Sequence, residues 1–308
     1  MKSGQGSRTA EGAAALRASH TLYADPKIFE DPYAYALTSP RWQRLLKNRP
    51  LNRLVARLLL RRLAPITAQV VARSRYTEDR LATAVARGVA QYVMVGAGLD
   101  SFTLRRRDLE QTLRVFEVDH ADTQGWKRQR LARLTDALPR NLEFVAVDFE
   151  RESLAQALRR SAYRTEVPAF YSWLGTTHYL TPAATLATLE SITTIAAPGS
   201  ELVFDYSLPR ELIPAREQRA GGLLRRYTAR QGEPMIGQFV PEQLHGALTR
   251  LGFEVVEDLS GAAQAQRYFA NRDDGLHPTQ ASHFLHARLL GPVHRYFAHA
   301  LLPPNAPG

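Results

Sequence analysis

The sequence predicts an α/β fold, in which a doubly wound, mostly parallel sheet carries helices on both faces. Three observations predict it. Short apolar segments alternate with helical segments from residue 91 onward, and the first of them, Tyr92-Val93-Met94-Val95, runs directly into a glycine-rich turn. Acidic residues also stand at the ends of two later apolar segments. Strict alternation is typical of parallel sheets, because each parallel strand needs a crossover helix to bring the chain back.

Periodicity and capping residues predict a helical N-terminal cap over residues 1–90. Residues 9–22 are expected to form a helix capped by Thr9, and Asp25-Pro26 and Asp31-Pro32 mark the loop that follows, since a residue before proline avoids the helical conformation. Apolar side chains at helical spacing predict two further helices, at 51–63 and 64–88.

The remaining elements form the sheet and its crossovers. Thr181-Pro182 opens one helix as cap and first-turn proline, and the prolines, glycines and arginines of 209–238 indicate an inserted lid. Apolar residues at 267–270 are expected to form a terminal antiparallel strand. The core then spans 91–276, and 277–308 form a C-terminal tail. Strands are expected at 92–95, 114–119, 142–147, 167–173, 201–206 and 252–259, and helices at 121–138, 153–163, 182–198 and 241–251.

Composition limits the class of protein. Of the 308 residues, 44% are apolar and 23% are charged, so the chain can bury a full core. There is no cysteine, which excludes disulfides, thiolate nucleophiles and cysteine-bound zinc. No secretory signal or membrane-length apolar segment is present. We expect a cytoplasmic protein that has no membrane partner and binds no metal.

The net charge of +10 is concentrated in one segment. Residues 33–76 contain ten Lys or Arg and no Asp or Glu. This segment has three interpretations: a lid over an acidic substrate, a contact with nucleic acid or an anionic membrane, or a solvated helix face. Solvation is favoured for most of the residues, with Arg73 and Arg75 as exceptions, and the few aromatic residues argue against nucleic acid as a partner. The sequence leaves the oligomeric state open.

A candidate nucleotide site follows the first strand. Gly96 and Gly98 leave bare backbone for a ligand to approach, and Asp119 ends the next strand, where a carboxylate can accept the hydroxyls of a ribose. This pattern suits both NAD and S-adenosylmethionine. Asp100 and Ser101 favour S-adenosylmethionine, because a dinucleotide would bring phosphates to Asp100 and needs a small residue in place of Ser101.

Asp148-Phe149 ends the third strand and has two interpretations. The carboxylate and the ring could hold an adenine. Alternatively, Asp148 is an ordinary strand terminus that caps the following helix. The sequence does not separate the two.

Together these motifs resemble the leucine carboxyl methyltransferase family, which consists of class I, Rossmann-like, S-adenosylmethionine-dependent enzymes, and in particular its bacterial small-molecule O-methyltransferases. The resemblance covers most of the chain. It rests on Ser7-Arg8-Thr9-Ala10 to Arg17-Ala18, Asp31-Pro32, Ser74-Arg75-Tyr76, Val95-Gly96-Ala97-Gly98-Leu99-Asp100-Ser101, Phe116-Glu117-Val118-Asp119, Asp148-Phe149, Gly175-Thr176-Thr177-His178-Tyr179-Leu180, Gly199-Ser200 to Asp205-Tyr206, and Arg267-Tyr268-Phe269.

The resemblance implies roles for individual residues in binding S-adenosylmethionine. Arginines in the N-terminal region would hold the donor's carboxylate, as a planar guanidinium can. The family often has Glu where this chain has Leu174, and leucine cannot accept a hydrogen bond from the donor's amino group. The cofactor-binding residues implied are Gly96 and Gly98 for the donor, Asp119 with the adjoining His120 for its ribose, Asp148 and Phe149 for adenine, Arg17 and Arg75 for its carboxylate, and Leu174 beside the amino group.

The expected reaction is methyl transfer to an oxygen of a small, acidic acceptor. A carboxylate is ionised at neutral pH and needs no base, whereas a phenol, with a pKa of about 10, does. The resemblance favours the carboxylate. His178 and Tyr206 are the catalytic candidates for activating or orienting an acceptor, although each is also explained as an ordinary structural residue.

Two other classes of protein remain open on the sequence alone. A nicotinamide-dependent oxidoreductase would use the same glycine-rich turn, although Ser101 argues against it. A non-catalytic basic module that binds nucleic acid or anionic lipid would keep the fold without turnover.

Overall fold

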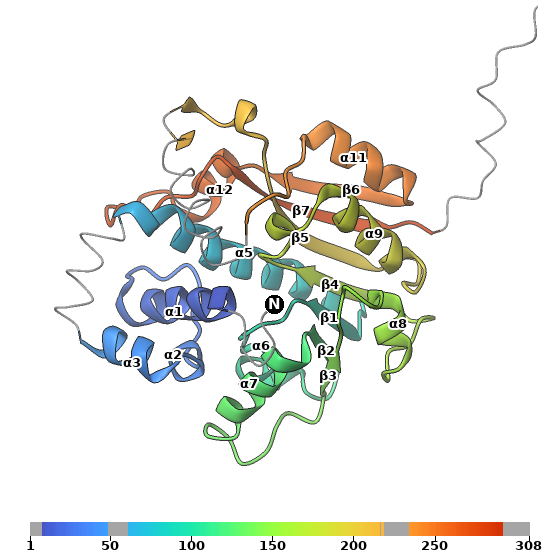
Figure 1. The fold of residues 1–308 in the computed structure, drawn as a ribbon, viewed down its shortest axis with the longest axis horizontal. Coiled ribbons are helices and arrows are strands. Elements are labelled where there is room, and N and C mark those ends of the chain that lie inside the picture. Colours follow the sequence, from blue (N-terminus) through green and yellow to red (C-terminus); the bar gives the residue numbers. More distant parts are fainter. Residues whose placement is uncertain (1–7, 49–60, 216, 219–233, 292–308) are drawn as a thin grey trace, which may run out of the picture.

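The computed structural model describes residues 8–48, 61–215, 217–218 and 234–291, and its centre is one seven-stranded sheet (Figure 1). The strands are β1 Gln91–Val95, β2 Arg114–Asp119, β3 Leu142–Ala146, β4 Ala169–Trp173, β5 Glu201–Ser207, β6 Phe253–Leu259 and β7 Ser282–Leu289. Their order across the sheet is β3-β2-β1-β4-β5-β7-β6. β1 to β5 pair in parallel, and β7 runs antiparallel to both β5 and β6. The sheet is therefore doubly wound and mostly parallel, as predicted.

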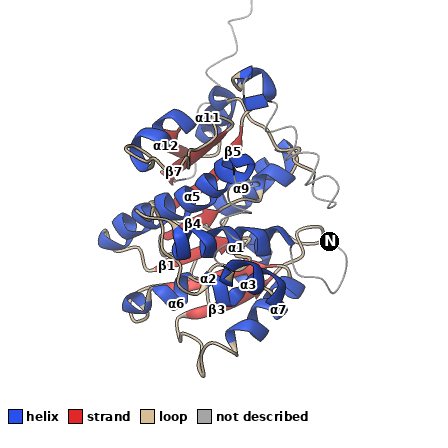
Figure 2. Ribbon diagram, turned by 90° about the vertical axis from the view of Figure 1, so that its left-hand side faces the viewer, coloured by secondary structure: helices blue, strands red, loops and turns tan. Residues whose placement is uncertain are grey.

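Helices cover both faces of this sheet (Figure 2). One face packs against α5 Arg61–Ala86, α6 Phe102–Arg105 and α12 Gly261–Tyr268, with Tyr76, Phe102 and Val203 in the shared core. The other face packs against α8 Leu154–Arg159, α9 Pro182–Thr193 and α11 Pro241–Arg250. Both cores consist mainly of buried apolar side chains, so hydrophobic burial on the two faces stabilises the sheet.

The N-terminal cap consists of α1 Arg8–Tyr23, α2 Ala34–Leu37 and α3 Pro40–Lys47, and it lies beside α7 Ala121–Leu131 (Figure 1). Its small alanine side chains allow α1 and α2 to pack closely. The prediction that Thr9 caps this helix is wrong, because α1 already includes Arg8 and Thr9 lies in its first turn. The helix expected at 51–63 lies outside the described residues except for the start of α5.

The structure also corrects the end of the sheet. Residues 267–270 do not form a strand, because Ser260 caps α12 by accepting a hydrogen bond from the Ala263 amide and the alanines that follow favour a helix. The antiparallel strand is β7, which lies within the segment expected to be a tail. The helix capped by Thr181 is confirmed, since its side chain accepts from the Ala184 amide and Pro182 occupies the first turn.

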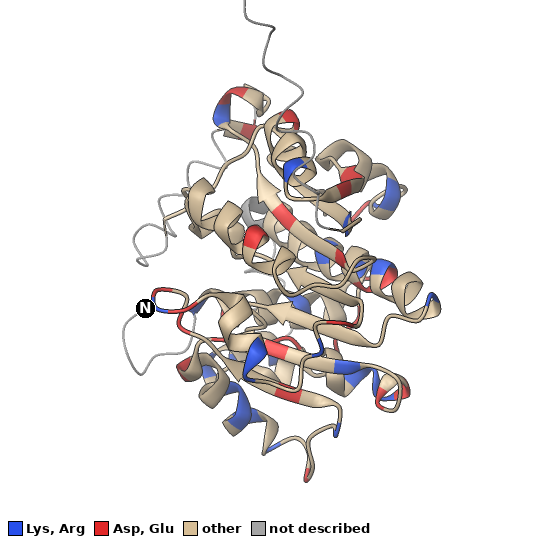
Figure 3. Cartoon of the chain, turned by 90° about the vertical axis from the view of Figure 1, so that its right-hand side faces the viewer, with Lys and Arg blue, Asp and Glu red and all other residues tan. Residues whose placement is uncertain are grey.

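The expected lid lies mostly outside the described residues, which include only its two ends. On its C-terminal side, the Ile236 and Gly237 amides donate to the His178 carbonyl, at 2.8 and 3.0 Å. This end of the segment therefore touches the loop after β4. Throughout the described ranges, every helix is too short or too polar to traverse a bilayer. Figure 3 shows the molecule from the right-hand side of Figure 1, where Lys and Arg are interspersed with Asp and Glu along the described ribbon.

Candidate active site

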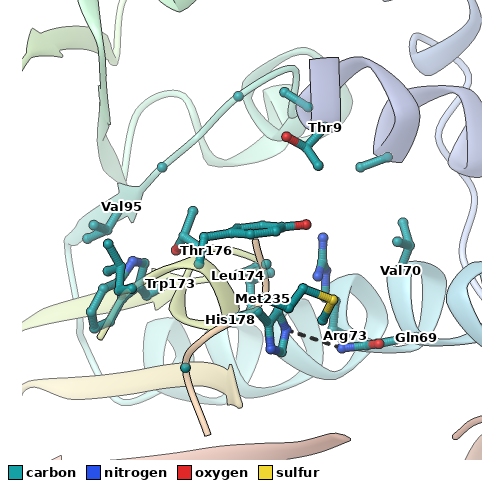
Figure 4. A pocket seen from close by; sticks show the side chains of 18 of the residues that line it. Thr9, Gln69, Val70, Arg73, Val95, Trp173, Leu174, Thr176, His178 and Met235 are labelled. Carbon is teal, nitrogen blue, oxygen red and sulfur yellow. Dashed lines mark hydrogen bonds between the residues drawn. The ribbon is translucent and has the colours of Figure 1, made fainter. Parts of the chain in front are cut away.

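A cavity of about 2600 Å³ opens at the carboxyl ends of β1, β2, β3 and β4 and is also lined by residues of α1 and α5. The strand order reverses between β1 and β4, and open α/β sheets bind ligands at such a point. Figure 4 shows Thr9 of α1 facing Arg73, Gln69 and Val70 of α5 across the space, with Leu174 and Thr176 farther to the left.

The glycine-rich turn after β1 forms part of this wall. Gly96 and Gly98 have φ values of +70° and +51°, in the left-handed region that favours glycine. A Cβ on Gly96 would lie 2.8 Å from Cγ2 of Thr176, and one on Gly98 would lie 3.0 Å from Cβ of Ala10. Neither position has room for a side chain, and the bare backbone of the turn lines the cavity, as predicted from the sequence.

Asp119 ends β2 and lines the cavity. Its Oδ2 accepts a hydrogen bond from the Gly98 amide at 2.6 Å, and its Oδ1 accepts from the His120 amide at 2.7 Å. Each carboxylate oxygen keeps a further lone pair, so the group can still accept two hydroxyls. Burial raises the pKa of Asp119 above its usual value. His120 begins α7 as its N-cap and lines the same wall.

Asp148 and Phe149 line the neighbouring part of the cavity. Asp148 does not cap α8, because Ser153 does so in a capping box with Gln156. Its Oδ1 instead accepts from the Glu150 amide at 3.0 Å, within the turn after β3. Phe149 is 48% exposed although it borders a cavity, and a planar ring at that position can cover an adenine. The helix-capping interpretation of Asp148 is therefore wrong.

Arg17 lies at the cavity in a fixed position. Its Nε donates to Oδ2 of Asp31 at 2.9 Å, and its Nη2 donates to the Leu99 carbonyl at 2.7 Å. The side chain is almost fully buried. Arg17 therefore ties α1 to the glycine-rich turn, and Asp31 balances its charge.

The structure does not bring Arg75 to the cavity. Its guanidinium is half exposed and pairs with Asp79 at 2.8 Å, one turn further along α5. Arg73 lines the cavity instead. Two residues along a helix are separated by about 200°, so only one of the two arginines can face inward. The sequence set both arginines apart from the solvated helix face but assigned the donor's carboxylate to Arg75, and that choice is wrong.

Arg73 is held by a buried carboxylate. Its Nη1 lies 3.0 Å from Oδ2 of Asp205, and Asp205 has no exposed side-chain surface. The Gly175 amide donates to Oδ1 of the same group at 2.6 Å. Burial opposes ionisation, but Arg73 and then His178 keep the pKa of Asp205 well below its usual range. Asp205 is therefore an anion that orients the loop after β4.

Leu174, which stands where the resemblance led us to expect a Glu, lines the cavity immediately before Gly175. Its side chain is apolar and packs beside the core. A Cβ on Gly175 would lie 2.5 Å from Nη1 of Arg73, so the guanidinium rests directly on this backbone. The polar groups beside Leu174 thus come from α5 and β5, and sequence order gave no signal of that contact.

His178 and Tyr206, the two catalytic candidates, lie on opposite sides of the sheet. His178 lines the cavity and contacts Asp205 at 3.1 Å and Oγ of Ser207 at 2.8 Å. Tyr206 is buried in the core on the other face, where its hydroxyl donates to Oδ2 of Asp258 at 2.6 Å. Burial and then Asp258 raise the pKa of Tyr206 far above its usual value. Its expected catalytic role is therefore wrong.

The residues that the sequence interpretation missed are Gln69, Asp205 and Ser207. A signal for the last two exists in the alternation of β5, because Asp205 and Ser207 share one face while Tyr206 points to the other. Within the described part of the chain, no group of three His, Asp or Glu side chains is placed to hold a metal ion.

The fold and the site together define the class: a Rossmann-like sheet with an antiparallel seventh strand, a glycine-rich turn after β1 and a carboxylate after β2 form a class I methyltransferase. Two solved structures share this fold. One is a DUF574 family protein from Streptomyces avermitilis, with a TM-score of 0.57, 16% identity and coverage of 90% of this chain and 97% of that one. The other, from Thermobifida fusca, is titled a putative methyltransferase and has a TM-score of 0.54, 17% identity and coverage of 92% and 97%.

Sequence comparison identifies the family. The leucine carboxyl methyltransferase model matches residues 10–193. A Bacillus subtilis protein named putative S-adenosyl-L-methionine-dependent methyltransferase YktD is 30% identical over 93% of this chain and 99% of its own length. A Mycobacterium avium protein with the same description is 31% identical over 64% of this chain and 66% of its own length.

The chain belongs to the leucine carboxyl methyltransferase family. It is an enzyme, a methyltransferase whose methyl donor is S-adenosylmethionine. This assignment replaces the oxidoreductase and the non-catalytic module that the glycine-rich turn and the basic segment left open. The residues of the cavity fit the donor: Asp119 keeps lone pairs for two hydroxyls, and Arg73 offers a cation for a carboxylate.

Proposed function

We propose that this enzyme methylates a carboxylate of a small, acidic molecule and so forms a methyl ester. The observation that carries the proposal is the match to the leucine carboxyl methyltransferase family over residues 10–193, which include α1, α5 and the loops after β1 to β4 that line the cavity. We further propose that the acceptor is a free small molecule rather than nucleic acid or a membrane component, and that the enzyme works in the cytoplasm.

The distribution of charge in the cavity supports an acidic acceptor. Acidic side chains gather beside Asp119 and Asp148, where a donor carrying an ammonium and a sulfonium is stabilised by them. Cationic side chains, Arg8 of α1 and Arg41 of α3, line the side formed by the cap. An anionic acceptor is attracted to that second side.

The cavity also has room for two molecules. Pockets for one small ligand usually have volumes of about 300 to 1000 Å³, and this one reaches about 2600 Å³ as bounded by the described residues. A donor that reaches from the ends of β2 and β3 to Arg73 fills only part of this volume and leaves the rest for an acceptor.

The chemistry requires alignment and the exclusion of water. A carboxylate oxygen attacks the methyl carbon as the bond from that carbon to sulfur breaks, and the electron pair returns to sulfur. The acceptor is ionised at neutral pH, so no base is needed. Groups that hold the two reactants in line therefore supply the rate enhancement.

The test is methyl transfer from labelled donor to a panel of small carboxylic acids. We expect label in products that release methanol on mild alkaline treatment, which is diagnostic of an ester. The matched control is the preformed methyl ester of each acid, which offers no carboxylate and should take up no label. Label that is stable to alkali in every product would refute carboxylate methylation.

A further inference from the structure

Three side chains stand in series on the wall of the cavity. Oγ of Ser207 lies 2.8 Å from Nδ1 of His178, and Nε2 of the same ring lies 3.1 Å from Oδ2 of Asp205. Ser207 and His178 both line the cavity, whereas Asp205 is fully buried behind them. A hydroxyl, an imidazole and a buried carboxylate in this order form the arrangement that moves a proton away from a bound group in many enzymes.

The partners of the ring fix its hydrogen. Asp205 is an anion held by Arg73 and also accepts from Nε2 of Gln69 at 3.2 Å. The Gln69 amide nitrogen also lies 3.4 Å from Nε2 of His178, but its two hydrogens are donated to Asp205 and Ser282. Asp205 can only accept, so Nε2 of His178 carries the hydrogen that it donates to Asp205. Nδ1 is then the basic nitrogen, and it accepts the hydroxyl hydrogen of Ser207. Gln69 also donates to Oγ of Ser282 at 2.7 Å, so the amide cannot turn freely.

We propose that Ser207, His178 and Asp205 form a proton relay, and that the site consequently also methylates neutral hydroxyl acceptors of the phenol or enol class. This inference rests on the proposed function for the site, and adds to it a second class of acceptor and two catalytic residues, Ser207 and His178. Asp205 is the positioning residue that fixes the ring.

Position in the fold supports the relay. Asp119 and Asp148 lie at the ends of β2 and β3, on one side of the reversal in strand order, and the relay lies at the ends of β4 and β5, on the other side. It therefore lies across the cavity from the residues implied for the ribose and the adenine, next to Arg73. Burying the Asp205 carboxylate has a desolvation cost. Methyl transfer to an ionised carboxylate needs no base, so that reaction alone gives no reason for the buried carboxylate behind His178.

The step balances without a further reactant. The acceptor oxygen attacks the methyl carbon while its hydrogen passes to Oγ of Ser207, and the serine hydroxyl hydrogen passes to Nδ1 of His178. The carbon–sulfur bond breaks, and its electron pair stays on sulfur as the thioether. The imidazolium is stabilised by Asp205, and His178 returns its proton to water when the products leave.

The experiment uses phenols of increasing pKa and the full chain with Ser207→Ala and His178→Asn. We expect kcat/KM for the least acidic phenols to fall about 100-fold, the usual contribution of general base catalysis. The loss should shrink as the phenol becomes more acidic, and carboxylic acids should lose less than the phenols do. In both variants the rate with a weakly acidic phenol should recover as pH rises toward the phenol's own pKa. Tyr206→Phe, on the same strand but facing the other side, is the matched control and should behave as the unaltered protein.

Three results would overturn the relay: no phenol is methylated while carboxylic acids are, the loss is equal for every phenol, or raising the pH restores nothing. If phenols alone are methylated and the variants lose that activity, the relay stands and the carboxylate proposal fails. A measurement independent of any acceptor is ¹⁵N NMR of the histidine rings at neutral pH. We expect Nδ1 of His178 to carry no hydrogen and its signal to move in Ser207→Ala, and a hydrogen on Nδ1 would refute the proposal.

Discussion

Arg73 and Arg75 offer a matched pair of substitutions, because they lie two residues apart on one helix and only Arg73 faces the cavity. We expect Arg73→Gln to weaken binding of the donor and Arg75→Gln to leave it unchanged. Glutamine keeps the aliphatic stem and an amide donor but removes the charge. Both variants lower the net charge equally, so a general electrostatic effect would appear in both.

The magnitude for Arg73 follows from its contacts. A hydrogen bond to a charged group contributes about 1.5 to 3 kcal/mol, so the dissociation constant for the donor should rise about 10-fold to 150-fold. Asp205 loses one partner but keeps His178, Gln69 and the Gly175 amide. The loss of stability should therefore be about 2 kcal/mol, less than the 3 to 5 kcal/mol typical of a buried charge with no partner.

For Arg75 the expected effect is small. Its side chain is 50% exposed, and its guanidinium donates to Asp79 and to the Ile28 carbonyl. An exposed pair of this spacing contributes about 0.3 to 0.5 kcal/mol. Calorimetric titration with S-adenosylhomocysteine, which the enzyme does not consume, measures the affinity, and urea unfolding without ligand measures the stability. Equal weakening by the two variants, or weakening by Arg75→Gln alone, would refute this assignment of the donor's carboxylate.

Three further predictions concern the turn, the ribose carboxylate and acid stability. Gly96→Ala should lower both the melting temperature and donor affinity, because its φ of +70° and the 2.8 Å approach to Thr176 exclude a side chain. Gly125→Ala, at a helical position with open space around it, is the control and should stabilise the protein by about 0.5 to 1 kcal/mol. Equal melting temperatures for the two variants would contradict this prediction. Asp119→Asn should raise the calorimetric dissociation constant for the donor at least about 10-fold, since an amide nitrogen cannot accept hydroxyls, and unchanged affinity would place the ribose elsewhere. Burial and then Arg272 lower the pKa of His20 to about 4. The unfolded chain therefore binds a proton at this residue below about pH 6.5 while the folded chain does not, so the free energy of unfolding should fall by about 2 kcal/mol between pH 7.5 and 5. His20→Asn should reduce this pH dependence of stability, measured by urea unfolding, and an unaltered dependence would refute the assignment.

Much of the fold was predictable, because local signals and the fold agree over the central strands. Tyr92 to Val95 are apolar on both faces and end at glycine, as a strand buried between two helical layers must. The error at 267–270 has a local cause. An apolar group of that length fits a strand or a helix, and the Ser260 cap with the alanines after it decided for the helix.

The site was predictable where chemistry and backbone coincide. Gly96, Gly98 and Asp119 lie at the ends of adjacent strands, so strand order alone brings them together. Which of Arg73 and Arg75, and which of Asp205 and Tyr206, contributes to the site depends on how one helix and one strand are oriented. Each pair is close in the chain, and its members point in different directions.

The amino-acid sequence by itself determined the parallel sheet, the turn for the nucleoside and the family, since these depend on the period of apolar residues and on residue types at strand ends. Only the tertiary structure decided which polar groups meet in the cavity. Asp205 contacts Arg73, 132 positions earlier, and His178, 27 positions earlier. Such contacts form when α5 packs across the sheet, and packing depends on all the side chains of both surfaces at once, which no local pattern encodes.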